Sequence, residues 1–497
     1  MRTLQKGCWR WMGLCLLWAV LAWSGNLQAV EKPEKKIGPR STKAFTWTEH
    51  GQAMQAVCEE LSVQVTALPS GTVLWEYEAH KPLVPASLVK LLTSYAALKV
   101  MGADYRFRTE IWADGKPLHG VLSGNLWIKG YGDPFLVPER IWLLAQKVRS
   151  QGIEKVQGGI FVDDSAFDPP FEHLCLDNQC DRPHNPVISA TALNYNTVQV
   201  EILSGKGKAA SHDIRAFPST DYAVFRQEWA AQTKNPGAGL QSLGVGDDGR
   251  ETFRVHGKKP DEPFQTVEYR TNIQDPQRFA ALTFRRALKD AGIAVQSADA
   301  GLRPLPDPAF LIYRLESPPL SDVLYGLNRY SNNFMAEMIL RVLGFHVYGF
   351  PGSSAKGCRV VQDVLAELGV PAAERTLDSG SGLTRTTRVS AAAFNRVLMA
   401  AHRDWEVGPE FLASFARSGE EGTLRKRMKA CAADYTIRGK TGTLRDVVGF
   451  SGYVGNISGT AYAVTVIMNG VANPWKAREA LDAFVTGIPR LVAAKGP

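Results

Sequence analysis

Several common features are scarce or missing in this chain of 497 residues. After the first thirty residues, no apolar run is long enough to span a bilayer, which argues against a membrane channel or transporter. There is no Lys/Arg block of the kind that nucleic-acid-binding tails carry, and internal repeats and low-complexity linkers are missing. The composition, 45% hydrophobic and 21% charged, predicts a soluble globular protein of two or more domains.

The first 29 residues have the layout of a secretory signal peptide. Arg2, Lys6 and Arg10 precede an apolar run from Trp11 to Trp23, and small and polar residues follow. An uncleaved anchor helix is the alternative, although the run is shorter than the ~20 residues that a spanning helix needs. Removing this segment lowers the formal net charge from +8 to +5, because it holds three positive and no negative side chains.

Five cysteines remain after the signal, so at least one has no intramolecular partner. In an oxidising compartment, the close pair Cys175 and Cys180 predicts a local disulfide. The same stretch also holds His173 and His184, which leaves a zinc site as the alternative.

The predicted secondary structure changes in character twice along the chain. A short helix is predicted at 47–60, followed by two alternating strands at 61–68 and 72–79 that form a hairpin, and then by a helix near Ser87. From about 105 to 305, short apolar runs broken by Gly, Pro, Asn and Asp predict a β-rich region. Helical periodicity returns after 306, and the chain closes with three strands at 434–444, 448–455 and 461–470 and a helix at 475–492.

Ser87 and Lys90 lie one helical turn apart in "PASLVK". A serine at a helix entry usually caps backbone N–H groups, which is the structural interpretation. The catalytic interpretation is a nucleophile with its own base, which requires an amine of lowered pKa. The spacing alone is weak evidence, since "SSAK" at Ser353 to Lys356 has it too. We interpret that second occurrence as a loop, because glycines flank it and no apolar helix follows at once.

Ser331 and Asn333 stand in "RYSNNFMAE". Residues at i and i+2 do not share a helical face, but a turn between two helices would let both side chains point into one cleft. There a hydroxyl can relay a proton, and a carboxamide can orient a lysine and bind a substrate amide.

The stretch "RGKTGTL" places Lys440 to Thr443 in a predicted strand. Thr441 and Thr443 would face one way, while Gly442 leaves room for another backbone to lie close. Lys440 would supply a second cation that lowers the pKa of Lys90 and attracts a carboxylate.

The motifs S-x-x-K, S-x-N and K-T-G in this order resemble those of penicillin-binding proteins and class A β-lactamases. The chain is most similar to the low-molecular-mass, class C type penicillin-binding proteins, which are D-alanyl-D-alanine carboxypeptidases and endopeptidases with a large insertion after the first motif. The long interval between Ser87 and Ser331 supports this branch, as do "GYGDPFL", "VDDSAF" and "ALNYNTVQV" within it, "SGSGLTR" at 379–385, and "GFSGYV" after "GKTGTL".

The resemblance implies an α/β fold with a transpeptidase-like domain, in which helices flank an antiparallel sheet and form a helical subdomain. It implies a split of that domain into residues 30–105 and 306–497, with a β-rich insertion at 106–305 and the signal peptide at 1–29. It also implies a periplasmic location, with peptidoglycan peptides as substrates and β-lactams as covalent inhibitors. No cofactor, metal or nucleic-acid partner is expected, while association with the membrane surface or the cell wall stays open.

Five residues receive catalytic roles from the resemblance. Ser87 is the acylated nucleophile and Lys90 the base that takes its proton. Ser331 and Asn333 assist proton transfer and hold the substrate amide, and Lys440 tunes the electrostatics. A β-lactamase and a catalytically inactive envelope protein with the same fold remain as alternatives. A class A β-lactamase would need a deacylating glutamate, and the insertion occupies the interval where it is expected.

Substrate-binding residues follow from the same resemblance. Thr441 and Thr443, with Gly442 between them, would bind the terminal carboxylate, and the N–H groups of Ser87 and Thr443 would form the oxyanion hole.

Ser381 and Arg385 match positions that contact the substrate side chain. Here the chain departs from the family pattern, because Ser379 stands where an aspartate is usual and Asp378 is displaced by one residue.

Overall fold

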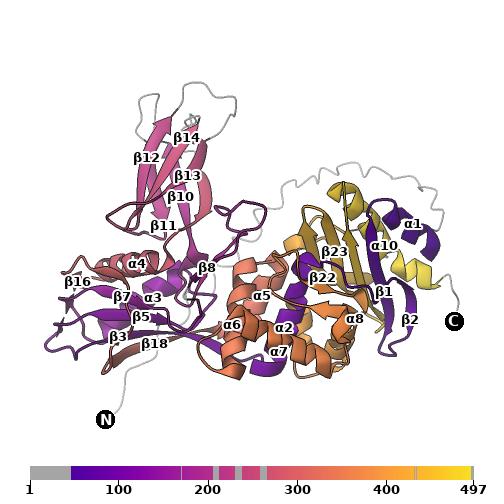
Figure 1. Ribbon diagram of the computed structural model, residues 1–497, viewed down its shortest axis with the longest axis horizontal. Coiled ribbons are helices and arrows are strands. Elements are labelled where there is room, and N and C mark those ends of the chain that lie inside the picture. The colour runs from indigo at the N-terminus through magenta and orange to yellow at the C-terminus, as the bar shows by residue number, and fades with distance from the viewer. Residues whose placement is uncertain are drawn as a thin grey trace, which may run out of the picture. The chain divides into compact units, whose positions relative to one another are not determined.

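A computed structural model describes residues 46–169, 171–204, 212–229, 238–257, 266–429, 431 and 434–493 (Figure 1). The predicted signal peptide at 1–29 lies outside these residues. Within the described ranges, no helix combines the length and the apolar character that crossing a membrane requires.

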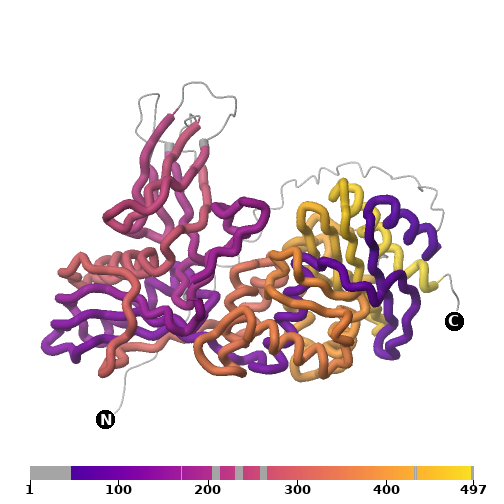
Figure 2. Tube along the Cα trace, in the orientation of Figure 1, coloured from indigo at the N-terminus to yellow at the C-terminus, as the bar shows by residue number. Residues whose placement is uncertain are grey.

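A six-stranded antiparallel sheet joins the two ends of the described chain. β1 pairs with β24 along its whole length, so that indigo and yellow segments run side by side in Figure 2. The predicted β1–β2 hairpin and the three C-terminal strands are confirmed. In sheet order the strands are β2 (Val73–Tyr77), β1 (Glu60–Leu68), β24 (Ala461–Asn469), β23 (Val447–Asn456), β22 (Tyr435–Leu444) and β21 (Ala416–Arg417).

Both faces of this sheet are covered, because side chains alternate along each strand and both sets are apolar. On β23, Phe450 and Val454 pack in the core under α1 (Trp47–Gln55) and α10 (Pro474–Ala493), while Tyr453 packs in the core on the other face. The predicted antiparallel sheet flanked by helices is thus confirmed.

The other face carries a helical layer. Its central helix α2 (Val89–Met101) is buried continuously from Val89 to Leu98, because other helices surround it. The remaining helices of this layer are α5 (Leu320–Tyr330), α6 (Asn333–Tyr348), α7 (Ser354–Glu367), α8 (Ala391–Arg403) and α9 (Gly408–Ala413).

The loop predicted at "SSAK" is wrong. Ser353 is the N-cap of α7, and its hydroxyl accepts from the backbone N–H of Lys356. The glycine that suggested a loop lies inside the helix, where an added Cβ on Gly357 would come within 2.0 Å of the Leu340 carbonyl oxygen. Gly357 therefore permits the close packing of α7 on α6.

The region between α2 and α5 is rich in strands, as expected, but it also contains two helices that the sequence analysis missed. α3 (Pro138–Ser150) and α4 (Pro276–Asp290) both begin with proline, and Asp275 caps α4. They pack on a mixed sheet with the order β17-β7-β5-β3-β18, around a core of its own. The strands of this sheet are β3 (Arg106–Ala113), β5 (Leu126–Gly130), β7 (Ile160–Asp163), β17 (Ala300–Leu302) and β18 (Phe310–Pro319).

Smaller sheets complete this region. Three of them have three strands each, in the orders β11-β10-β15, β12-β14-β13 and β16-β6-β4 (Figure 1). Because β18 pairs with β3, we propose that the insertion extends to about residue 319 and not to 305. The remaining strands are β4 (Val121–Leu122), β6 (Lys155–Val156), β8 (Phe171–His173), β9 (Val187–Ser189), β10 (Thr197–Ser204), β11 (His212–Phe217), β12 (Ala223–Trp229), β13 (Ala238–Val245), β14 (Glu251–Gly257), β15 (Thr266–Asn272), β16 (Ala294–Val295), β19 (Arg375–Thr376) and β20 (Arg388–Val389).

The inserted region also shares a core with the helical layer. Phe107, Phe167 and Ile188 are buried in the same cluster as side chains of α2 and α6. The backbone of Gly352 bonds to the segment at Phe167, donating to Ala166 and accepting from Asp168.

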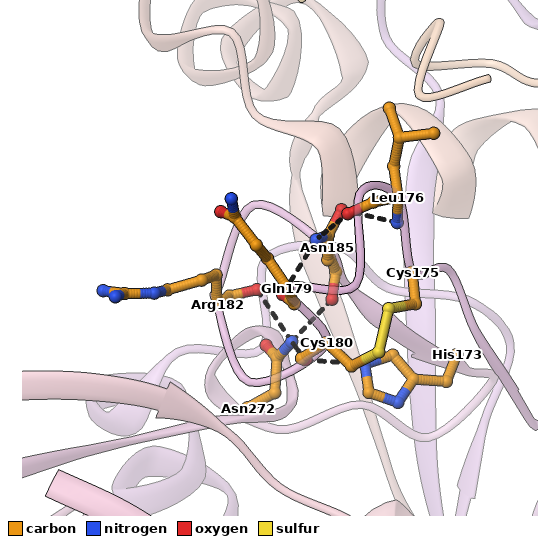
Figure 3. Close-up of a disulfide and its surroundings, with 8 residues drawn as sticks. All are labelled: His173, Cys175, Leu176, Gln179, Cys180, Arg182, Asn185 and Asn272. Carbon is orange, nitrogen blue, oxygen red and sulfur yellow. Dashed lines mark hydrogen bonds between the residues drawn. A yellow bond between two sulfur atoms is a disulfide. The ribbon is translucent and has the colours of Figure 1, made fainter. Parts of the chain in front are cut away.

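A disulfide joins Cys175 and Cys180, as predicted (Figure 3). Among the described residues, no three His, Cys, Asp or Glu side chains are grouped to hold a metal, so the zinc alternative at His173 and His184 finds no support. His173 Nε2 instead lies 2.8 Å from the Cys180 carbonyl oxygen.

A substitution at Phe484 tests the packing of α10 on the sheet. Its side chain is fully buried and its ring lies 5.4 Å from Trp75 and 6.1 Å from Trp47, between centroids. Phe484→Ala should lower the free energy of unfolding by about 3–5 kcal/mol, because it leaves a cavity. Guanidinium unfolding followed by tryptophan fluorescence measures this. Trp405→Ala, which removes a 91% exposed ring, is the control and should change it by less than about 0.5 kcal/mol; equal losses would contradict the packing.

Candidate active site

Ser87 lies in a single 3₁₀ turn, η1 (Ala86–Leu88), directly before α2. Neither η1 nor α2 has a side-chain hydrogen bond at its N-cap, so the structural interpretation of Ser87 as a helix cap is wrong. Its Oγ instead lies 2.8 Å from Lys90 Nζ. Ala86, just before it, has a φ of +50°, an uncommon backbone conformation for a residue with a Cβ.

Lys90 is completely buried and its amine is surrounded by acceptors. Nζ donates to Ser87 Oγ, to Asn333 Oδ1 at 2.7 Å and to the Ser381 carbonyl at 2.7 Å. Burial lowers the pKa of Lys90 to about 7, against the opposing effect of the Glu337 carboxylate. A substantial fraction of Lys90 is therefore neutral near pH 7 and able to accept a proton from Ser87.

Ser331 and Asn333 lie where α5 ends and α6 begins. Ser331 has the left-handed conformation, with a φ of +59°, and Asn332 caps α6. The predicted turn between two helices is confirmed, and it lets both side chains face the same group of lysines. Asn333 accepts from Lys90, and Ser331 Oγ accepts from Lys440 Nζ at 2.8 Å.

Lys440 reaches the site from β22 and is also completely buried. Besides Ser331, it donates to the Thr441 carbonyl at 2.7 Å. Burial and the positive charge of Lys90 hold the pKa of Lys440 well below its usual range. The pKa of Lys90 is lowered, as expected, but burial lowers it and not the charge of Lys440.

The edge of β22 lies against η1. An added Cβ on Gly442 would come within 2.6 Å of the Pro85 carbonyl oxygen, which confirms the expectation that this glycine admits a second backbone. Thr441 is buried and Thr443 is exposed beside it. The K-T-G stretch thus forms a wall directly beside the Ser87 turn.

The segment 379–385 closes the site on a further side. An added Cβ on Gly382 would lie 1.9 Å from the Ala86 carbonyl oxygen, and the residue has a φ of +76°. The side chain of Ser381 is completely buried, and its carbonyl accepts from Lys90. Its expected contact with the substrate side chain stays a prediction. Arg385 is partly exposed and pairs with Asp446, with Asp177 3.9 Å away.

Glu337 is the residue that the sequence analysis missed. It is buried on α6, one turn after Asn333, where its Oε1 accepts from the Ser381 N–H at 2.9 Å and from Ser379 Oγ at 2.7 Å. Its other oxygen pairs with Arg341. The departure at Ser379 is thereby explained, since an aspartate there would face this carboxylate. The sequence held one indication of this residue: Glu337 follows Asn333 by four positions, which places both on one face of a helix.

A serine and a lysine of lowered pKa, opposite a second serine–lysine pair at the edge of an antiparallel sheet, define the class of the penicillin-binding and serine β-lactamase-like fold. The sequence pattern of the D-Ala-D-Ala carboxypeptidase 3 (S13) family matches residues 50–488, and the chain belongs to this family.

Individual relatives agree with this result. The chain is 30% identical over 453 residues to a D-alanyl-D-alanine carboxypeptidase of Actinomadura sp. (strain R39), covering 86% of this chain and 82% of the relative. It is 25% identical to the D-alanyl-D-alanine carboxypeptidase DacB of Haemophilus influenzae, with coverages of 80% and 83%. The crystal structure of penicillin binding protein 4 (dacB) from Haemophilus influenzae has the same fold, with a TM-score of 0.72, 23% identity and coverages of 87% and 98%.

Glu337→Gln tests the electrostatics of the buried lysine. Because the carboxylate raises the pKa of Lys90, its removal favours the neutral amine and should move the acid limb of the acylation rate to lower pH. Stopped-flow acylation by a fluorescent penicillin from pH 5 to 9 measures this.

Glu374→Gln is the matched control, since Glu374 is also buried but bonds to Ser390 and His80, away from the site. An acid limb that stays in place in Glu337→Gln, or moves equally in both variants, would contradict the assignment.

Proposed function

We propose that this protein is a serine-type D-alanyl-D-alanine carboxypeptidase that acts on peptidoglycan stem peptides through an acyl-enzyme at Ser87. The observation that carries the proposal is the 2.8 Å contact of Ser87 Oγ with Lys90 Nζ, together with a Lys90 pKa of about 7. Family membership supports the substrate class. One solved relative, the Haemophilus influenzae protein, was crystallised in complex with a novel β-lactam, which supports covalent binding of such drugs here.

Acylation begins with neutral Lys90, which takes the proton of the Ser87 hydroxyl. Oγ then attacks the carbonyl carbon between the two D-alanines, and the N–H groups of Ser87 and Thr443 stabilise the oxyanion. The C–N bond breaks, and the leaving amine takes the proton from Lys90 by way of the Ser331 hydroxyl, which leaves Lys90 neutral again. Lys440 holds the Ser331 hydroxyl in place.

Deacylation releases the shortened peptide. Water attacks the ester carbon, its proton passes to Lys90, and Ser87 regains its hydroxyl. During acylation Thr441 and Thr443, beside Gly442, hold the terminal carboxylate, which then departs with the leaving D-alanine. Asn333 holds the substrate amide, and the segment of Ser381 and Arg385 borders the substrate side chain.

The same site can accept a D-alanyl cross-link between two stems, because the reaction differs only in the leaving amine. We therefore include endopeptidase activity in the proposal. A periplasmic location after removal of residues 1–29 brings the enzyme to this substrate and fits the disulfide.

Ser87→Ala should abolish both covalent labelling by a fluorescent penicillin and release of D-alanine from a pentapeptide. Gel fluorescence and a D-amino-acid oxidase assay measure the two. The matched control is Ser353→Ala in the second S-x-x-K sequence, which removes only the cap of α7 and should label like the wild type. Labelling that survives in Ser87→Ala would refute the nucleophile.

Two purified substrates separate the two peptidase activities. With a pentapeptide and a cross-linked muropeptide offered in separate reactions, we expect loss of D-alanine from the first and cleavage to monomers in the second, both blocked by penicillin. Mass spectrometry identifies the products. The acyl-enzyme formed with penicillin should persist for minutes or longer; rapid turnover of the drug would favour the β-lactamase alternative.

A further inference from the structure

The carboxamide of Asn333 is held between two parts of the chain that are far apart in sequence. Its Oδ1 accepts from Lys90, and its Nδ2 donates to the backbone carbonyl of His184 at 2.5 Å. His184 belongs to residues 174–186 between β8 and β9, which we call the disulfide loop. An asparagine amide has two N–H groups, so one remains for a substrate amide.

These two contacts fix which way the carboxamide points. If the amide were turned over, its NH2 group would face the ammonium of Lys90 and its oxygen would face the His184 carbonyl. Both contacts would then be repulsive, donor against donor and acceptor against acceptor. The carbonyl of His184 therefore stabilises the orientation in which Asn333 accepts from Lys90.

The disulfide loop is itself held in one conformation, as Figure 3 shows. The Cys175–Cys180 bond closes one end, where His173 contacts the Cys180 carbonyl. The Asn185 side chain closes the other end through bonds to Leu176 and to the Gln179 carbonyl at 2.8 Å.

Asn272, at the end of β15, anchors the loop to the inserted region. Its Nδ2 contacts three loop carbonyls, those of Cys180 at 2.8 Å, Arg182 at 2.9 Å and Asn185 at 2.5 Å (Figure 3). Its backbone N–H donates to the Asp181 carbonyl at 3.0 Å. The side chain is buried, so these contacts are shielded from water.

A second contact places the loop at the edge of the site. Asp177 Oδ1 lies 3.9 Å from Arg385, so the loop reaches both Arg385 and Asn333. The inserted region thereby meets two of the residues that the proposed function uses, although none of its described residues takes part in the proposed reaction steps.

We propose that the disulfide loop is a positioning element of the active site, which holds the His184 carbonyl against Asn333 and thereby keeps the carboxamide oxygen on Lys90. Asn272 is the positioning residue that holds the loop. The inference rests on the proposed function, because it gives the inserted region a part in acylation of Ser87.

Asn272→Ala tests the anchor. We expect acylation by a fluorescent penicillin to slow by about tenfold or more, because the reacting groups are less well oriented. The acid limb of the pH profile of acylation should also move to lower pH. The Asn333 oxygen would be held less firmly on Lys90, so the charged form of Lys90 would be less favoured. Arg270→Ala, two residues earlier on β15, is the control, because Arg270 bonds to Gln199 on the next strand; its rate should stay within about twofold of the wild type.

The disulfide gives a second test that does not depend on Asn272. Cys175→Ser/Cys180→Ser, and the wild type in dithiothreitol, should show the same slowing and the same shift of the acid limb. The wild type should recover on reoxidation, and the double variant should not respond to the reductant. Thermal melting identifies which variants are folded.

Two results would overturn the proposal. The first concerns folded variants that lack the anchor or the disulfide: an acylation rate within about twofold of the wild-type rate, together with an unmoved acid limb. The other is slower acylation with an unmoved acid limb and a lower melting temperature, which indicates a structural role alone. Absence of Ser87 labelling in the wild type is a different outcome and would refute the proposed function itself.

Discussion

The withdrawal of two lysine side chains from water is the constraint on which the rest of this structure depends. A buried ammonium is unfavourable unless acceptors surround it, and a base is useful at neutral pH only if its pKa is lowered. The fold meets both demands at Lys90, which has three acceptors from three different elements and no exposed surface. Lys440 is equally buried, and the positive charge of Lys90 further disfavours the charge on Lys440. The reactivity that we propose for Ser87 is thus a consequence of packing around amines.

This constraint explains why so many elements converge on one point. The helices that surround α2 bury it from Val89 to Leu98, and they bury Lys90 with it. α6 begins at the site, which brings Asn333 and Glu337 to it on one face. Gly382 and Gly442 let two backbones come close to the turn of the nucleophile, which excludes water from the space between them. Glu337 supplies a negative charge that acts on Lys90 and favours its protonated form, against the effect of burial.

The motif residues and most of the helices and strands could be predicted from the sequence, because both depend on local spacing. The turn at Ser331 and the close approach at Gly442 followed from elementary geometry. Three other features were not accessible in this way. α3 and α4 were missed because short strands with many Gly, Pro and Asn surround them. The beginning of α7 was missed because Gly357 in it serves the contact with α6. The contact of His184 with Asn333 depends on a tertiary arrangement that no sequence spacing records.

The pairing of β1 with β24 determines how late during synthesis the sheet can be completed. A ribosome makes the Ser87 turn early, but β22, which carries Lys440, and β24, which completes the sheet beside β1, are among the last segments to emerge. Contacts between such distant segments form late, after most of the chain is available. A chain that is still being synthesised therefore lacks the second lysine and the β22 wall of the proposed site. The enzyme becomes chemically competent only when it is whole.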